Sequence, residues 1–104
     1  MERICFTFQL RPGREDEYRR RHDEIWPELV EAIRDAGIRN YSLFRRELQV
    51  IAYAECHPDA ATAFGKVAAT DVNRRWAESF ADVIDRLVDE RGQLFRAEEV
   101  WHLE

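Results

Sequence analysis

Apolar and polar side chains alternate along the first ten residues of the chain. In residues 3–10, RICFTFQL, one side of the pattern consists of Ile4, Phe6, Phe8 and Leu10, and the other of Cys5, Thr7 and Gln9. A period of two is typical of a β-strand. Because neither of these two sets carries a charge, we expect both faces of the predicted strand to be covered.

After a turn at Pro12–Gly13 the apolar spacing changes to that of a helix over residues 14–36. Its less polar flank is formed by Tyr18, His22, Trp26 and Leu29, which recur every three or four positions. Pro27 has no N–H to donate to the preceding turn, and its ring crowds that turn, so we expect the helix to bend or break there. Gly37 is expected to end it.

Two further strands are predicted over residues 38–46 and 48–56. Only about two residues near Glu47 separate them, which indicates a tight hairpin, although the usual Asn-Gly or Asp-Gly pair is missing. Pro58 then begins a helix that we expect to span residues 59–68.

The last third of the chain is predicted to hold one more helix and one more strand. Thr70–Asp71 have the pattern of an N-cap for a helix over residues 71–88. The apolar line of this helix is Val72, Trp76, Phe80, Val83 and Leu87. Residues 94–103, LFRAEEVWHL, are predicted to form the final strand.

The predicted order is therefore β-α-β-β-α-β, in a single domain that spans residues 1–104. With two right-handed crossovers this is a ferredoxin-like α+β fold, in which four antiparallel strands form one sheet and the helices cover one face. The other face contains Phe, Tyr, Ile or Val in either register and is poorly suited to water. We therefore expect two copies to pack sheet against sheet in a homodimer, a dimeric α/β barrel.

The composition and charge of the chain narrow its possible partners. Apolar residues make up 45% of the 104 positions, charged residues make up 36%, and the net charge is −5. This charge argues against binding to nucleic acid or to an anionic membrane. There is no leader-like pattern and no stretch approaching ~18 apolar residues, so we expect a cytoplasmic protein. Cys5 and Cys56 lack a CxxC partner and are expected to be buried thiols, with their separation in space left open.

His22 is the first candidate for chemistry. It is either a core histidine with satisfied ring nitrogens, or an acid–base group whose ordinary pKa of ~6.5 lets it take and give a proton near neutral pH. Tyr18 and Trp26, one turn away on either side, would place the imidazole between two rings. Tyr41 and Trp76 are either core aromatics or the flat faces with polar groups that a sugar site needs. No metal-ligand spacing such as HxxxH and no nucleotide-binding motif is present, so we expect neither a metal nor a cofactor.

Three stretches of the chain carry a resemblance to a known family. They are EYRRRHDEIWPEL at 17–29, NYS at 40–42 and ATDVNRRW at 69–76. Together they resemble the L-rhamnose mutarotase family, whose members are small dimeric ferredoxin-like enzymes of sugar metabolism. The first stretch is the most specific, and the likeness weakens in the last twenty residues.

The resemblance implies that His22 is the catalytic proton donor and that Tyr18, Tyr41 and Trp76 contact the substrate. The implied reaction interconverts the α and β anomers of L-rhamnose, or of a related 6-deoxy sugar such as L-fucose, without a cofactor. Some family members have a second tryptophan where this chain has Ala77, which leaves the preferred sugar open. The base that would work with His22 is also open: a tyrosine hydroxyl, a bound water or a carboxylate could serve.

Two other classes of function fit the same pattern. A dimeric α/β barrel monooxygenase, cofactor-free or haem-degrading, would use the same fold and an aromatic pocket around a histidine. A non-catalytic module that binds a small ligand is the second alternative. Binding of haemin would favour the first, and sugar binding without anomer exchange would favour the second.

Overall fold

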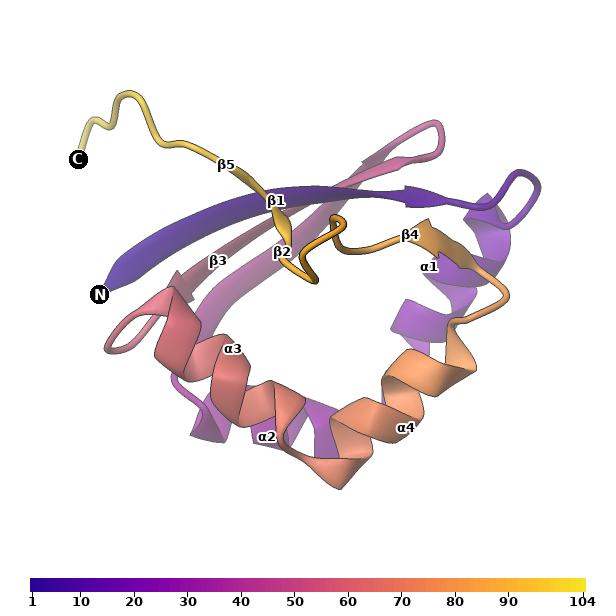
Figure 1. The fold of residues 1–104 in the computed structure, drawn as a ribbon. Helices are drawn as coiled ribbons and strands as arrows, with labels where there is room; N and C mark the ends of the chain where they lie inside the picture. The colour runs from indigo at the N-terminus through magenta and orange to yellow at the C-terminus, as the bar shows by residue number, and fades with distance from the viewer.

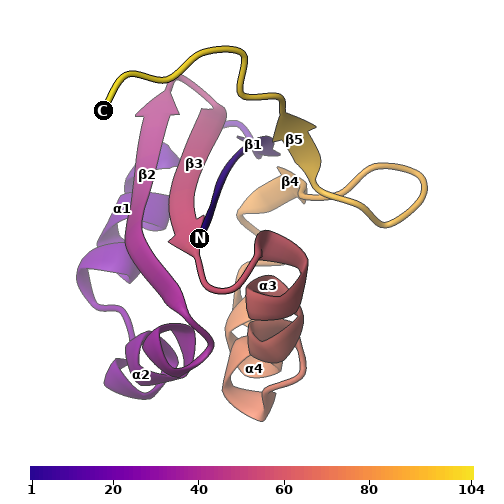
Figure 2. The same cartoon turned by 90° about the vertical axis from the view of Figure 1, so that its left-hand side faces the viewer.

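The computed structural model describes residues 1–104 and consists of one sheet with four helices on one of its faces (Figure 1). The elements in chain order are β1 (Glu2–Leu10), α1 (Glu15–Asp23), α2 (Pro27–Asp35), β2 (Ile38–Arg46), β3 (Gln49–Cys56), α3 (Ala60–Ala68), α4 (Asp71–Ser79), β4 (Ile84–Arg86) and β5 (Phe95–Ala97). Figure 2 shows that α1 and α2 form one pair of helices and α3 and α4 a second pair. None of the helices is long and apolar enough to cross a membrane.

The sheet has the strand order β2-β3-β1-β4, every pair is antiparallel, and β5 also pairs with β1. This confirms the predicted ferredoxin-like α+β fold. The edge position beside β1 is shared by two short strands, where the sequence had suggested a single long one.

The alternation of side chains along β1 decides which residues form the core. The buried residues of this strand are Ile4, Phe6, Phe8 and Leu10. The inward side chains of the neighbouring β3, from Val50 to Cys56, have no exposed surface. All belong to one cluster of 16 buried residues, which also includes Tyr18 of α1 and Val67 of α3. Full burial of each large apolar side chain contributes roughly 1.5–3 kcal/mol, so this cluster holds the helices to the sheet.

The predicted break at Pro27 divides the expected helix over residues 14–36 into two. α1 ends at Asp23, and α2 begins with Pro27 as its first residue, where no N–H is required. Trp26 precedes it in an extended conformation, with a ψ of 127°. The break therefore leaves His22 in the last turn of α1, just before the chain changes direction.

The expected helix over residues 71–88 is wrong beyond Ser79. α4 begins as predicted, with the side chain of Thr70 as its N-cap, but it ends at Ser79. Phe80 and Val83 are buried in the core, and the chain then turns to pair with β1 as β4. Apolar spacing could not distinguish this path from a continued helix, because two buried side chains three positions apart would also share one side of a helix.

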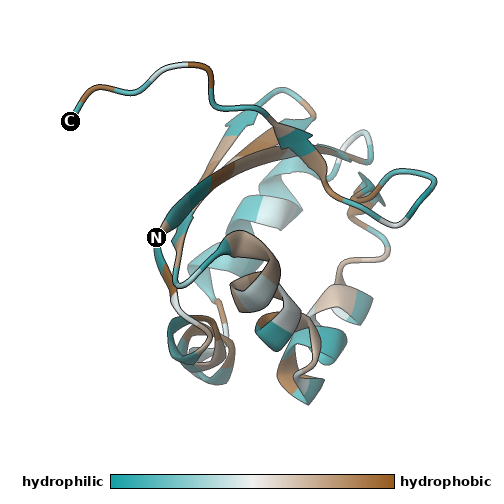
Figure 3. Cartoon of the chain, turned by 60° about the vertical axis from the view of Figure 1, so that its left-hand side comes forward, coloured by the Kyte–Doolittle hydropathy of each residue, from teal (hydrophilic) through white to brown (hydrophobic).

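The expected strand over residues 94–103 is also wrong for most of its length. Only Phe95–Ala97 form a strand, and the pairing places Ala97 opposite Cys5. β1 begins at Glu2, so few residues beyond Ala97 have a neighbour to pair with. The remainder is an exposed tail whose apolar side chains contribute brown segments in Figure 3.

A bulge in β2 decides the orientation of Tyr41. Asn40 has a positive φ of 48°, and the register with β3 shifts by one residue between Arg39 and Ser42. Simple alternation from Ile38 would place Tyr41 on the helix-free face, and the bulge moves it to the other face. Tyr41 lies on the helix side, where its ring centroid is 6.0 Å from that of Phe64.

The two cysteines lie on opposite faces of the sheet. Cys56 is fully buried on the helix side, whereas Cys5 is half-buried on the helix-free side, and both are free thiols. The prediction of buried thiols is therefore right for Cys56 and only partly right for Cys5. Because the sheet lies between them, the two sulfur atoms do not approach each other.

Candidate active site

The imidazole of His22 lies among three aromatic rings. Its ring centroid is 4.3 Å from that of Tyr18, 5.3 Å from that of Phe80 and 5.4 Å from that of Trp76. Tyr18 comes from the preceding turn of α1, while Trp76 and Phe80 come from the last part of α4 and its C-cap. The structure thus brings together three of the four predicted site residues, and it adds Phe80 to them.

The hydrogen bond of His22 defines its tautomer. Nδ1 lies 2.9 Å from the main-chain carbonyl oxygen of Tyr18. A carbonyl can only accept, so Nδ1 carries a proton and donates it, and Nε2 is the nitrogen free for chemistry. Nε2 has no hydrogen-bond partner in the chain and is not sealed from solvent.

Burial lowers the pKa of His22 from its ordinary value of 6.5, while the Tyr18 carbonyl and the charge of Asp23 oppose this effect. The lowered pKa keeps most of the imidazole neutral at pH 7. In that state Nε2 presents a lone pair, so the resting side chain accepts a proton before it can donate one.

The two tyrosine hydroxyls face the same region of the interior. Burial raises the pKa of Tyr41 to about 12. Burial also raises the pKa of Tyr18, and the nearby Tyr41 raises it further. Both phenols are therefore protonated at neutral pH and can serve as hydrogen-bond donors, but a tyrosinate base is not available.

Trp26 does not occupy the place that the helical spacing predicted. Its ring packs against Trp76, with 5.1 Å between the ring centroids. Trp76 in turn contacts His22, so Trp26 is a neighbour of a neighbour of the imidazole. The change follows from the break before Pro27, which moves Trp26 out of α1. The second ring beside His22 is therefore Trp76, from a different helix.

An open groove of about 360 Å³ lies on the outer side of this aromatic group. Its lining residues are Arg20, Arg21, Glu24, Trp26, Trp76, Ser79 and Phe80. Of the predicted site residues only Trp76 lines it, and His22 does not. Trp76 and Phe80 thus separate the groove from the imidazole.

Sequence reasoning missed two aromatic residues of this region. The sequence pattern places Phe80 in the apolar line of a helix, and its position four residues after Trp76 is the signal that could have found it. Phe64 of α3 stands between Phe6 and Tyr41, with ring centroids at 5.8 and 6.0 Å, and no pattern singled it out. No group of three or more His, Cys, Asp or Glu side chains is placed to hold a metal ion.

A ferredoxin-like α+β chain with a half-buried histidine among three aromatic rings, one of them a phenol, has the features of a small proton-transfer enzyme. The family model described as L-rhamnose mutarotase matches residues 3–103, so the chain belongs to the L-rhamnose mutarotase family. Mutarotases are isomerases, and both the family and the enzyme class predicted from the sequence are confirmed. The match includes the last twenty residues, where the resemblance had weakened.

Individual relatives agree with this family. An L-rhamnose mutarotase of Burkholderia orbicola (strain MC0-3) is 42% identical over 104 residues, which is the whole of both chains. One of Acidiphilium cryptum (strain JF-5) is 39% identical over 103 residues, or 99% of each chain. Among solved structures, an L-rhamnose mutarotase of Formosa agariphila superposes over the full length of both chains, with a TM-score of 0.80 and 26% identity.

Proposed function

We propose that this protein interconverts the α and β anomers of L-rhamnose, or of a related 6-deoxy sugar such as L-fucose. The supporting observation is a histidine with a free Nε2, in a member of this family, whose ring lies beside the phenol of Tyr18 and the indole of Trp76. Mutarotation transfers no group and no electrons, so it requires only an acid and a base near two oxygens on one carbon. These residues can supply both.

The proposed reaction begins when neutral His22 takes the proton of the anomeric hydroxyl at Nε2. The bond between the anomeric carbon and the ring oxygen then breaks, and the ring oxygen takes a proton from a donor on its other side. Rotation about the next carbon–carbon bond turns the aldehyde over. On closure the ring hydroxyl returns its proton, and the imidazolium of His22 protonates the new anomeric oxygen. His22 is therefore the base in opening and the proton donor in closure.

Tyr18 and Tyr41 are proposed to bind the sugar through their hydroxyls, and Trp76 through its ring face. The raised pKa values of both phenols favour a role as neutral hydrogen-bond donors. One of them, or a water that it holds, is the candidate donor to the ring oxygen. A flat indole suits the C–H face and methyl group of a deoxy sugar.

The experiment that tests this function is saturation transfer NMR on the anomeric protons, with and without the protein. We expect faster exchange between the α and β signals of L-rhamnose, L-fucose, or both, and no acceleration for an aldose that is not bound. Exchange at the buffer rate with both sugars would contradict the proposal. Sugar binding without exchange would favour the binding module, and a haemin-induced spectral change would favour the monooxygenase.

The pH dependence of the reaction is a second expected result. Since the pKa of His22 lies below 6.5, kcat/KM should rise about tenfold per pH unit below that pKa and be level from about pH 7 upward. The same NMR measurement checks this between pH 5 and 8, after subtraction of the buffer-catalysed rate. An activity that falls as the pH rises from 6 to 8 would mean that the protonated ring is the resting form, and would refute the assignment of the base.

We also propose that the protein is a cytoplasmic homodimer in which the helix-free faces of two sheets pack together. This face carries the side chains of Cys5, Ile51 and Tyr53, and Phe44 on it is 60% exposed. Two free thiols favour a reducing compartment.

Phe44→Glu is expected to raise the dimer dissociation constant by about tenfold or more, because it would place a charge in an apolar contact. Sedimentation velocity at several protein concentrations measures the change. Lys66→Glu on the exposed surface of α3 is the control and should leave the dimer intact. A wild-type monomer at all concentrations would contradict the homodimer.

A further inference from the structure

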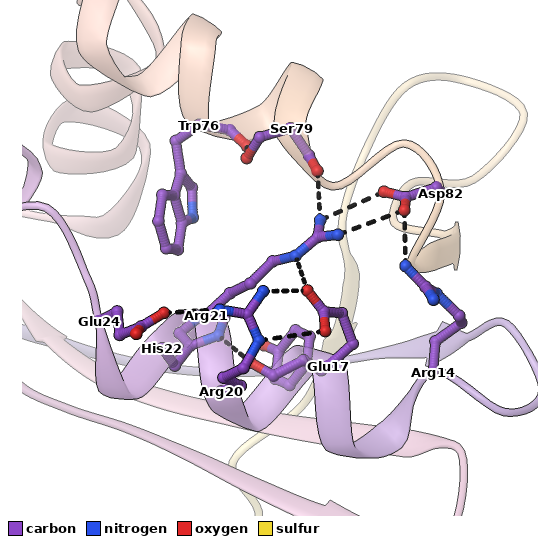
Figure 4. Close-up of polar contacts among 10 residues, drawn as sticks. Arg14, Glu17, Arg20, Arg21, His22, Glu24, Trp76, Ser79 and Asp82 are labelled. Carbon is purple, nitrogen blue, oxygen red and sulfur yellow. Dashed lines mark hydrogen bonds and ion pairs between the residues drawn. The ribbon is translucent and has the colours of Figure 1, made fainter.

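Arg21 precedes the candidate catalytic histidine and extends from α1 to the end of α4 (Figure 4). Its Nη1 donates to the main-chain carbonyl oxygen of Ser79 at 2.5 Å. Nη1 and Nη2 reach the two carboxylate oxygens of Asp82 at 3.2 and 3.3 Å, and Nε donates to Glu17 at 2.7 Å. One guanidinium thus binds two groups at the end of α4 and one on its own helix.

The surroundings of Arg21 make these contacts stronger than those of an ordinary exposed ion pair. Its side chain is only 22% exposed, and its guanidinium carbon lies 5.5 Å from the ring centroid of Phe80. Ser79 is the last residue of α4, whose terminal carbonyls lack partners within the helix and favour a nearby cation. Asp82 is held from a second side by Arg14, at 2.6 Å, at the N-terminus of α1.

The distances between His22 and the rings of Trp76 and Phe80 depend on the position of α1 relative to α4. Tyr18 and His22 are on α1, whereas Trp76 and Phe80 are on α4 and its C-cap, so the 5.4 Å between the rings of His22 and Trp76 is a distance between two helices. Arg21 is the residue adjacent to His22, and it makes a polar link across this gap to Ser79 and Asp82, in addition to the link from Arg14 to Asp82. A shift of about 1 Å at such a place can change a rate by about 100-fold.

We propose that Arg21 is a positioning residue, which ties α1 to the C-terminal end of α4 and thereby holds the imidazole of His22 against Trp76 and Phe80. Its effect on rate depends on the mutarotase function proposed above, whereas its effect on the imidazole does not. Lysine cannot replace it, because an ammonium group lacks the planar fork that serves Ser79, Asp82 and Glu17 together.

The test compares Arg21→Lys with Arg19→Lys, both of which keep the charge. Arg19 is exposed on the same helix and makes no hydrogen bond or ion pair, so its variant should behave like the wild type. For Arg21→Lys we expect kcat to fall by about 10- to 100-fold, with a smaller change in KM, in a protein that melts within a few degrees of the wild type.

A second readout does not require activity. In ¹⁵N-labelled protein the ring nitrogens of His22 should show the single Nδ1–H tautomer in the wild type and in Arg19→Lys, and broadened or mixed signals in Arg21→Lys. If the wild type shows no anomer exchange, this spectrum still decides the role of Arg21 while the proposed function fails. If Arg21→Lys does not fold, Asp82→Asn removes part of the link and should lower kcat by about 2- to 5-fold. Wild-type kcat together with an unchanged His22 spectrum in the folded variant would overturn the inference.

Discussion

His22→Gln is expected to lower the rate of catalysed anomer exchange by about 10²- to 10⁴-fold, which is the range that a positioned acid–base group contributes. Glutamine can keep a hydrogen bond to the Tyr18 carbonyl, but its amide cannot carry a proton between two sugar oxygens. The imidazole is only partly buried, so we expect the variant to fold and to melt close to the wild type. Saturation transfer NMR at equal protein concentrations measures the loss.

The matched control is His57→Gln, at an exposed position just after β3. It should retain the wild-type rate, because no side-chain hydrogen bond or aromatic contact links His57 to the site. A folded His22→Gln protein with the wild-type rate would end the assignment of His22 as the proton carrier. Loss of rate in both variants would indicate a general effect of the substitutions.

Gly37→Ala is expected to destabilise the protein by about 3 kcal/mol or more, through backbone strain and a steric clash. Gly37 joins α2 to β2 with a φ of +99°, and an added Cβ would lie 2.2 Å from the main-chain oxygen of His57. The two residues are also joined by a hydrogen bond from the His57 N–H to the Gly37 carbonyl, at 2.9 Å. The clash is therefore with backbone that a hydrogen bond holds in place.

Gly13→Ala separates the two causes. Gly13 has a similar φ of +83°, but nothing lies within 4 Å of the position of an added Cβ, so only the strain of about 1 kcal/mol remains. Urea denaturation at one fixed protein concentration measures both variants, since association would otherwise shift the midpoints. Equal losses of stability in the two proteins would show that the contact with His57 has no effect.

Local chemistry explains the parts of the fold that were predicted correctly. Pro27 cannot occupy the interior of a helix, Gly37 can adopt a positive φ, and Thr70 can cap a helix with its hydroxyl. Each of these effects depends on a residue and its immediate neighbours. The strands with clear alternation, β1 and β3, were predicted nearly to their bounds for the same reason.

The C-terminal third was predicted poorly because its path depends on β1. Phe80 and Val83 fit a helical line, yet they are buried where the chain turns back to the sheet. Residues 94–103 have apolar side chains suited to a strand, but the pairing with β1 covers only Phe95–Ala97, and the last residues of the tail extend beyond the start of β1. Neither fact can be derived from the sequence of the segment itself.

The candidate site shows the same division. The string around His22 and the positions of Tyr18 and Trp76 were available from the sequence, together with the family that they indicate. The packing of α1 on α4 places Phe80 beside the imidazole. It places Trp26 against Trp76 and not against His22.

The sequence by itself determined the family, the ferredoxin-like order of elements and the break beside His22, because spacing, proline and glycine act within a few residues. The tertiary structure decided the rest: the face on which Tyr41 lies, through the bulge at Asn40, and the tautomer and neighbours of His22. These depend on registers and on distances between helices. Such quantities arise only when segments far apart in the chain bury their side chains against one another.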